Sequence, residues 1–166
     1  MDFERFADAL DYPMFVVTAA HPATGERSGC LVGFASQCSI APARFLVCVS
    51  RANHTHPVAQ ASRVLAVHAL SARQRELAEL FGERTGDDTD KFARCRWTPG
   101  EEGVPLLTDC PRRFVGTVVD RLTGLGDHTG FVLAPLDSGD SAAGTPQMEP
   151  PLMYSDVRDM QPGHPS

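Results

Sequence analysis

Small and polar side chains fill residues 33–42, which read GFASQCSIAP. The segment carries hydroxyls and an amide but no charge, and the apolar runs GCLV and FLVCVS stand on either side of it. A plain hairpin joins two strands with two to five residues, usually Gly, Asn or Asp. The extra length therefore indicates either a barrel corner, where Gly and small residues accommodate a sharp bend, or a surface that contacts a ligand.

A second polar group follows directly after the FLVCVS run. It contains Ser50, Arg51, Asn53 and Thr55. Side chains at both ends of one loop can converge on a single anion, and a guanidinium with hydroxyls is a suitable donor set. The alternative for Arg51 is an ordinary solvated loop charge.

The histidines divide into three situations. His54 and His56 are two residues apart, so on an extended segment they would face one side, as two metal ligands would. No third Cys, His or carboxylate stands at a telling spacing, and we predict no metal site. His68 lies inside an apolar run and is expected in the core. His128 follows Gly126 and Asp127 at the start of a predicted strand, where the simplest interpretation is a turn histidine that bonds backbone.

Apolar and β-branched runs predict the strands that must position these residues. The uninterrupted run 45–50 predicts a strand that is covered on both faces. A helix is expected at 2–10 with Asp2 as N-cap, a short one after His54 with Thr55 as cap, and one that a Ser71–Gln74 capping box opens and Gly82 ends. The other predicted strands are 13–20, 28–34, 63–70, 93–97, 104–110, 112–122 and 128–136.

The order of these elements predicts the fold class. Six to eight strands, most joined by short turns, with two or three peripheral helices, are typical of a mainly β protein, here a small antiparallel β-barrel. The helices are too few for a regularly alternating α/β sheet. We expect one domain at 1–136 and a linker with a C-terminal tail at 137–166, which packs back on the domain or on the second subunit of a dimer.

Composition excludes some functions. The net charge is −6 with scattered acidic residues, which argues against a nucleic-acid partner. No apolar run approaches the roughly 20 residues that cross a bilayer, and MDFERFADAL lacks the features of a signal peptide. The cysteines are odd in number, five, without a C-x-x-C pair, so reduced thiols in a cytoplasmic protein without a membrane partner are expected.

Three segments in fixed order resemble a known family. GCLVGFASQCSIAPARFLVCVSRANHT, then RVLAVHALSARQRELAELFG, then GDHTGFVLAP are similar to the flavin reductase-like domain, the FMN-binding split barrel, from about Tyr12 to Pro135. The resemblance implies that the barrel is an antiparallel split β-barrel of the Greek-key type. It also implies that the segment after the second strand lies along the flavin, with backbone N–H groups and small hydroxyls on the ring, where fixed dipoles stabilise the charge of the reduced form. The residues it assigns to this segment are Gly33, Phe34, Ala35, Ser36, Gln37, Cys38 and Ser39.

The same resemblance assigns further roles. Ser50, Arg51, Asn53 and Thr55 would hold the phosphate tail of the cofactor at the start of a short helix. His128 would lie near the flavin or the nicotinamide as the catalytic residue. Lys91 would close over the flavin, although a plain surface loop at 83–91 is an equal alternative.

This chain departs from the family pattern near the expected ring site. Many members have Thr or Ser at the positions of Leu31 and Phe34, an Asn at Gly33, and a second Pro at Ala43. The loss of these polar side chains makes recognition of FMN depend more on backbone groups.

The resemblance implies an NAD(P)H-dependent FMN reductase. Hydride would pass from NAD(P)H to FMN, with FAD as a possible flavin, and the reduced flavin would serve an acceptor or a partner monooxygenase; the family is typically a homodimer. Three alternatives stay open: a flavin-binding redox module without turnover, a split barrel for deazaflavin or haem, and a small barrel without a cofactor. In the haem case His54, His56 or His128 would contact the cofactor.

Overall fold

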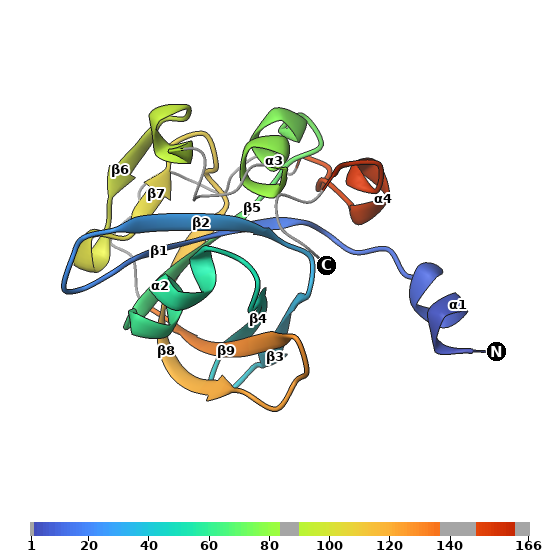
Figure 1. Ribbon diagram of the computed structural model, residues 1–166, viewed down its shortest axis with the longest axis horizontal. Coiled ribbons are helices and arrows are strands. Elements are labelled where there is room, and N and C mark those ends of the chain that lie inside the picture. Colours follow the sequence, from blue (N-terminus) through green and yellow to red (C-terminus); the bar gives the residue numbers. More distant parts are fainter. Residues whose placement is uncertain (1, 84–89, 137–148, 162–166) are drawn as a thin grey trace.

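The computed structural model describes residues 2–83, 90–136 and 149–161, and its main feature is a curled antiparallel sheet (Figure 1). Seven strands pair in the order β2-β1-β5-β8-β9-β4-β3, and a separate two-stranded sheet is formed by β6 and β7. The strands are β1 Phe15–Ala20, β2 Arg27–Val32, β3 Ala35–Ser39, β4 Arg44–Ser50, β5 Val64–Ala69, β6 Trp97–Pro99, β7 Pro105–Leu107, β8 Arg113–Leu122 and β9 His128–Pro135.

The connection between β2 and β3 forces the sheet to close. These strands are the two edges of the sheet, yet only Gly33 and Phe34 separate Val32 from Ala35. Seven flat strands would put the edges about 29 Å apart, whereas the two linking residues span at most about 11 Å. The sheet therefore curls until its edges meet without pairing, which makes it a split barrel and confirms the predicted fold class.

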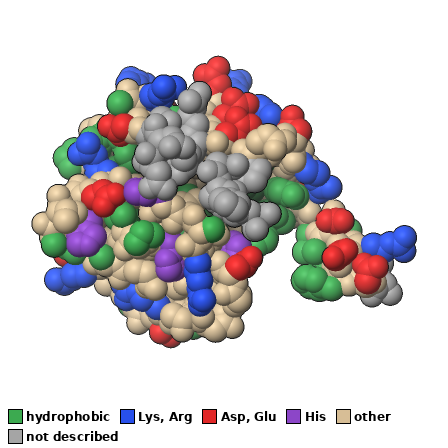
Figure 2. All heavy atoms as spheres, viewed as in Figure 1, with side chains coloured by type: hydrophobic (Ala, Val, Ile, Leu, Met, Phe, Trp, Pro, Cys, Tyr) green, Lys and Arg blue, Asp and Glu red, His purple; other side chains and the backbone are tan. Residues whose placement is uncertain are grey.

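In the described residues four α-helices accompany the barrel, and they are α1 Phe3–Asp8, α2 Thr55–Ala61, α3 Arg75–Gly82 and α4 Tyr154–Val157. Helix α2 packs on β1, β2 and β4, and α3 packs on the opposite face of β2. Helix α1 buries no residue and stands apart from the barrel (Figures 1 and 2). Within the described part of the chain, no helix is long and apolar enough to span a membrane.

Two apolar clusters hold the barrel together. The first fills its interior with side chains such as Val17, Val49 and Phe131, where the alternation of each strand directs them inward. The second lies outside β1 and β2, where Val16 and Phe81 pack with Leu107 and Leu152 from later parts of the chain. Strand β1 is consequently covered on both faces.

The structure corrects three expectations about local structure. Residues 35–39 are not a loop but strand β3, which pairs with β4 and has a register shift between Gln37 and Ser39. Strand β4 was expected to be covered on both faces, but it is covered on one face only, and its residues Leu46 and Cys48 are half-buried. The reason is that α3 and the tail pack over β1 and not over β4. Thr55 is not the cap of α2 but its first residue, with His54 before it.

The described part of the tail packs on the barrel of its own chain. The backbone N–H of Met14 donates to the Leu152 carbonyl at 2.8 Å, and the Leu152 N–H donates to Leu70 at 3.0 Å. The Leu152 side chain is 1% exposed. Residues 137–148, the predicted linker, lie outside the described residues, and packing of the tail on a second subunit stays a prediction.

Candidate functional site

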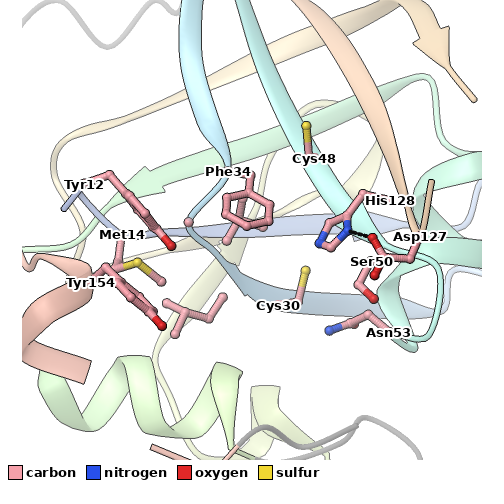
Figure 3. Close-up of a pocket in the computed structure, with 13 residues that line it drawn as sticks. Tyr12, Met14, Cys30, Phe34, Cys48, Ser50, Asn53, Asp127, His128 and Tyr154 are labelled. Atoms are coloured by element: carbon pink, nitrogen blue, oxygen red, sulfur yellow. Dashed lines mark hydrogen bonds and ion pairs between the residues drawn. The ribbon is translucent and has the colours of Figure 1, made fainter. Parts of the chain in front are cut away.

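A cavity of about 290 Å³ opens where the two edges of the barrel meet (Figure 3). The bend between β2 and β3 forms one side of it, and the end of β4 with the start of β9 forms another. The C-terminal tail adds a tyrosine. The lining residues are Tyr12, Met14, Cys30, Leu31, Val32, Gly33, Phe34, Cys48, Ser50, Asn53, Asp127, His128 and Tyr154.

The bend itself requires a glycine. A Cβ atom at Gly33 would lie 2.5 Å from Cε2 of Tyr12, so any side chain there would displace the tyrosine ring. Tyr12 thus occupies the space that an Asn side chain at this position would need. Phe34, the next residue, is 55% exposed and stands at the cavity.

Polar groups gather at the end of the cavity formed by β4 and β9. Ser50 and His128 are partners in the strand register, and the Arg51 N–H donates to the Asp127 carbonyl at 2.9 Å. His128 Nδ1 lies 2.7 Å from the Asp127 carboxylate (Figure 3). This hydrogen bond and the electrostatic attraction between the two groups lower the pKa of Asp127. The same hydrogen bond fixes the orientation of the His128 ring.

Aromatic rings form a continuous wall along the cavity. Tyr154 and Tyr12 stack with centroids 4.9 Å apart and an interplanar angle of 13°. Phe34 follows at 6.0 Å from Tyr12, and His128 at 5.3 Å from Phe34. Such a wall presents flat apolar surface beside a few hydrogen-bonding groups, which is the usual design of a site for a planar heteroaromatic ligand.

The thiols at the cavity are neutral. Burial raises the pKa of Cys30 to about 11 and also raises the pKa of Cys48. A thiol acts as a nucleophile only as thiolate, so neither cysteine is suited to covalent chemistry at neutral pH. Behind Cys30, the buried hydroxyls of Ser28 and Thr55 bond each other at 2.8 Å.

The cavity lining contains no lysine or arginine. The side chain of Arg51 is exposed beside the polar end; it donates to the Thr123 carbonyl, and its charge contributes to the lowered pKa of Asp127. A cavity without a cation in its lining, next to an exposed cation, suits a neutral ring inside and an anionic group outside.

The structure brings together five of the predicted site residues, and they are Gly33, Phe34, Ser50, Asn53 and His128. The others lie elsewhere. Residues 35–39 follow the bend along edge strand β3, where Ser36, Gln37 and Cys38 are exposed. Arg51 is outside the cavity, and Thr55 is buried behind it.

Lys91 has a different environment from the one expected. Its ammonium is buried and donates to the carbonyls of Gly29 and Phe81 at 3.3 and 3.1 Å, which ties β2 to the last turn of α3. Burial lowers the pKa of Lys91. The side chain does not line the cavity.

His54 and His56 do not share one face. They lie at the start of α2 rather than on an extended segment; His54 Nε2 contacts Glu26 at 3.0 Å and His56 Nε2 contacts Thr129 at 2.8 Å. Across residues 2–83, 90–136 and 149–161 no group of three His, Cys, Asp or Glu side chains could hold a metal.

Several lining residues were not predicted from the sequence. Asp127 could have been found from its place beside His128, and Cys30 from the alternation of β2. Tyr12 and Tyr154 carry no local signal, because 142 positions of chain separate them and only the packing of the tail brings them together.

The fold and this cavity place the chain among split barrels with a ligand site at the split. The sequence pattern of the flavin reductase like domain matches residues 7–163, and the chain belongs to that family.

Individual relatives agree with this assignment. The chain is 33% identical over 132 residues to the FMN reductase (NADH) RutF of Enterobacter sp. strain 638, covering 77% of each chain. The nitrilotriacetate monooxygenase component B of Mycobacterium thermoresistibile superposes with a TM-score of 0.75 at 25% identity, over 91% of this chain and 79% of that one. The NADH:FAD oxidoreductase SgcE6 of Streptomyces globisporus C-1027 gives 0.72 at 25% identity, over 81% and 78%.

Proposed function

We propose that this protein is an NAD(P)H-dependent flavin reductase that uses FMN, with FAD as a second flavin. The observation that carries the proposal is the aromatic-walled cavity, with no Lys or Arg in its lining, at the split of a barrel whose family is the flavin reductase like domain. Names of relatives support the same chemistry, since one is an FMN reductase (NADH) and another an NADH:FAD oxidoreductase. When bound, the flavin supplies the redox chemistry by accepting a hydride from the reduced nicotinamide.

The residues of the cavity fit the ring of such a group. Phe34 and Tyr12 offer apolar surface, while Ser50 and Asn53 offer hydrogen bonds at the other end. The protein's contribution is to bind and orient the two rings and to exclude water from between them. No acid–base group with a strongly shifted pKa is required for this task.

His128 is proposed as the residue that contacts the reacting rings. Its Nδ1 is engaged by Asp127, so Nε2 is the ring nitrogen that is left for a ligand in the cavity. The role follows from the placement of the ring between Phe34 and Ser50 on the cavity wall.

The cofactor's phosphate belongs outside the cavity in this proposal. Arg51 is an exposed cation beside the polar end, and Ser50 and Asn53 stand at the same turn. Thr55 contributes indirectly, because its N–H donates to the Asn53 side chain at 2.9 Å and so fixes that side chain. Backbone groups of β3, residues 35–39, remain proposed contacts of the ring edge, and Lys91 supports β2 behind it.

A homodimer is part of the proposal. The exposed large apolar side chains of the described residues include Phe3 and Phe6 on α1 and Leu10 just after it. Helix α1 stands off its own barrel (Figure 2), so its apolar face is available to a second subunit. The monooxygenase component among the structural relatives supports a partner monooxygenase, and the five free cysteines support a cytoplasmic location.

The visible spectrum of the purified protein with FMN, recorded anaerobically before and after NADH, tests the function. A perturbed flavin spectrum that bleaches with NADH or NADPH is the expected result. A perturbed spectrum that stays oxidised with both donors would instead indicate a flavin-binding module without turnover. An unperturbed spectrum with no NADH oxidation would contradict the proposal.

A further inference from the structure

Tyr12 and Tyr154 form a paired structure at the aromatic end of the cavity. Their rings are nearly parallel, and Figure 3 shows their phenol oxygens pointing the same way. Both side chains line the cavity and both are only partly buried. Two phenol O–H groups are thus presented together to any ligand in the cavity.

Contacts from the tail fix the position of Tyr154. Its backbone N–H donates to the Tyr12 carbonyl at 2.8 Å, and the guanidinium of Arg158 lies 5.1 Å from its ring centroid. The next residue, Ser155, donates from both its N–H and its hydroxyl to the Asp11 carboxylate, at 2.9 and 2.7 Å. These bonds hold the segments before β1 and after the barrel in one register, so the stack is preorganised.

Neither phenol oxygen has a hydrogen-bond partner within residues 2–83, 90–136 and 149–161. By contrast, the side chains of Ser50, Asn53, Asp127 and His128 each make a hydrogen bond. Partial burial raises the pKa of Tyr12, with the neighbouring Tyr154 adding to the effect, so the phenol stays protonated. A neutral phenol both donates and accepts a hydrogen bond. The unused capacity of two adjacent phenols is available to a ligand.

We propose that Tyr12 and Tyr154 determine ligand specificity by binding the amide or imide group of a planar heteroaromatic ring. Such a group alternates carbonyl acceptors with N–H donors along one edge, which matches two phenols that donate and accept side by side. A phosphate or carboxylate is disfavoured because no Lys or Arg lines the cavity to neutralise it.

The inference rests on the proposed function, which supplies two rings of this chemistry. The imide edge of the flavin is one source of the group, and the carboxamide of the nicotinamide is the other. The matched variants are Tyr12→Phe and Tyr154→Phe, which keep the stack and remove one hydroxyl each. Thr98→Val, which removes an exposed hydroxyl on β6 away from the cavity, is the control.

The test measures the Kd of FMN by fluorescence titration and the KM of NADH at saturating FMN. Loss of a neutral hydrogen bond weakens binding about 3- to 10-fold. A rise of that size in the Kd of FMN in both Tyr variants assigns the pair to the flavin. A rise in the KM of NADH with an unchanged Kd of FMN assigns it to the nicotinamide. The control should leave both constants unchanged.

A second measurement does not depend on the variants' folding. The chain has only two tyrosines, so NMR signals from ring-labelled tyrosine report this pair alone. Titration with FMN or with NADH should shift both. Unchanged constants in the variants and unshifted signals, in a wild-type protein that reduces FMN, would overturn the inference and leave the proposed function intact. A wild-type protein that binds neither ring would overturn both.

Discussion

Burial keeps two cysteines and one tyrosine at the cavity neutral, and this limits the chemistry that these residues can perform. The pKa values of Cys30, Cys48 and Tyr12 are all raised by burial. The exception is Asp127, whose pKa is lowered by His128. The site is therefore equipped to bind and orient rather than to supply a nucleophile, which is what an enzyme needs when its cofactor carries the reaction.

Removal of the exposed guanidinium should separate recognition of phosphate from recognition of the ring. Arg51→Ala is expected to weaken FMN binding about 10-fold, because charge-assisted hydrogen bonds to an anion are lost. Riboflavin, which has the ring but no phosphate, should bind the wild type and Arg51→Ala with equal affinity. The measurement is a pair of fluorescence titrations, with Arg63→Ala, an exposed arginine paired with Glu102, as the control. Equal losses for the two flavins would remove Arg51 from the phosphate site.

His68 should make the stability of the fold depend on pH. Its Nδ1 contacts the Val16 carbonyl at 3.0 Å, and its Nε2 accepts the Leu107 N–H at 3.0 Å, so the ring bridges β1 and β7 only when neutral. Burial lowers the pKa of His68 from 6.5 to about 4. The unfolded chain therefore binds a proton first, and about 3 kcal/mol of stability present above pH about 6.5 should be lost as the pH falls toward about 4.

Denaturant unfolding at a series of pH values measures this effect. The informative quantity is the difference between the wild type and His68→Gln, because that difference removes every contribution the two proteins share. Glutamine keeps a donor and an acceptor but cannot be protonated. The variant should show a shallower loss between pH about 6.5 and 4. Parallel curves for the two proteins would contradict the assignment.

Among the elements, the tail contributes to the cavity and to the core at once. Residues 149–161 bridge Pro13 and Ser71 through Met153 and Pro151, which places Leu152 in the outer cluster and Tyr154 on the cavity. The tail therefore couples the stability of the outer cluster to the shape of the site.

Truncation of the buried leucine should demonstrate this coupling. Leu152→Ala is expected to cost about 2–5 kcal/mol, because it removes buried methyl groups and leaves a cavity. It should also weaken flavin or nicotinamide binding through Tyr154. Leu136→Ala is the matched control, since Leu136 is 38% exposed. A midpoint of urea unfolding that changes equally in both variants would show that the tail does not stabilise the fold.

At the scale of the whole molecule, packing within the described part of one chain does not explain the exposed apolar face of α1. The hydrogen bonds of Asp11 and the contact of Arg158 with the Asp8 carbonyl orient it, yet Phe3 and Phe6 are 79% and 53% exposed. A helix of this length is not stable by itself in water, so a partner for its apolar face is expected.

The double variant Phe3→Ser, Phe6→Ser tests whether that partner is a second subunit. Loss of two aromatic contacts from an interface should weaken dimerisation at least about 10-fold. Sedimentation at a series of concentrations measures the dimer dissociation constant, and Val119→Ser on β8 is the control for an exposed apolar side chain elsewhere. A wild-type protein that is monomeric at all concentrations would contradict the proposed dimer.

The sequence by itself determined most of the strands and part of the site. Alternating and apolar runs predicted most strands other than β3, which was expected as a loop, because local patterns reflect local burial. The resemblance to the family at residue 33, at residues 50–53 and at His128 predicted one side of the cavity. The pairing of distant segments could not be predicted from the sequence. The apolar run of β4 gave no sign that only one of its faces is covered, since that depends on where α3 and the tail pack.

Tertiary structure alone decided which side chains meet. Val32 and Ala35 stand at opposite edges of the sheet order, and only the curling of the sheet turns Gly33 and Phe34 into the bend that opens the cavity. Tyr12 and Tyr154 meet because Leu152 is buried between Met14 and Leu70, a contact between distant parts of the chain. Lys91 donates to the carbonyls of Gly29 and Phe81, which is likewise a contact between segments that are separate in the sequence. Such contacts follow from how whole elements fill space, which no local pattern encodes.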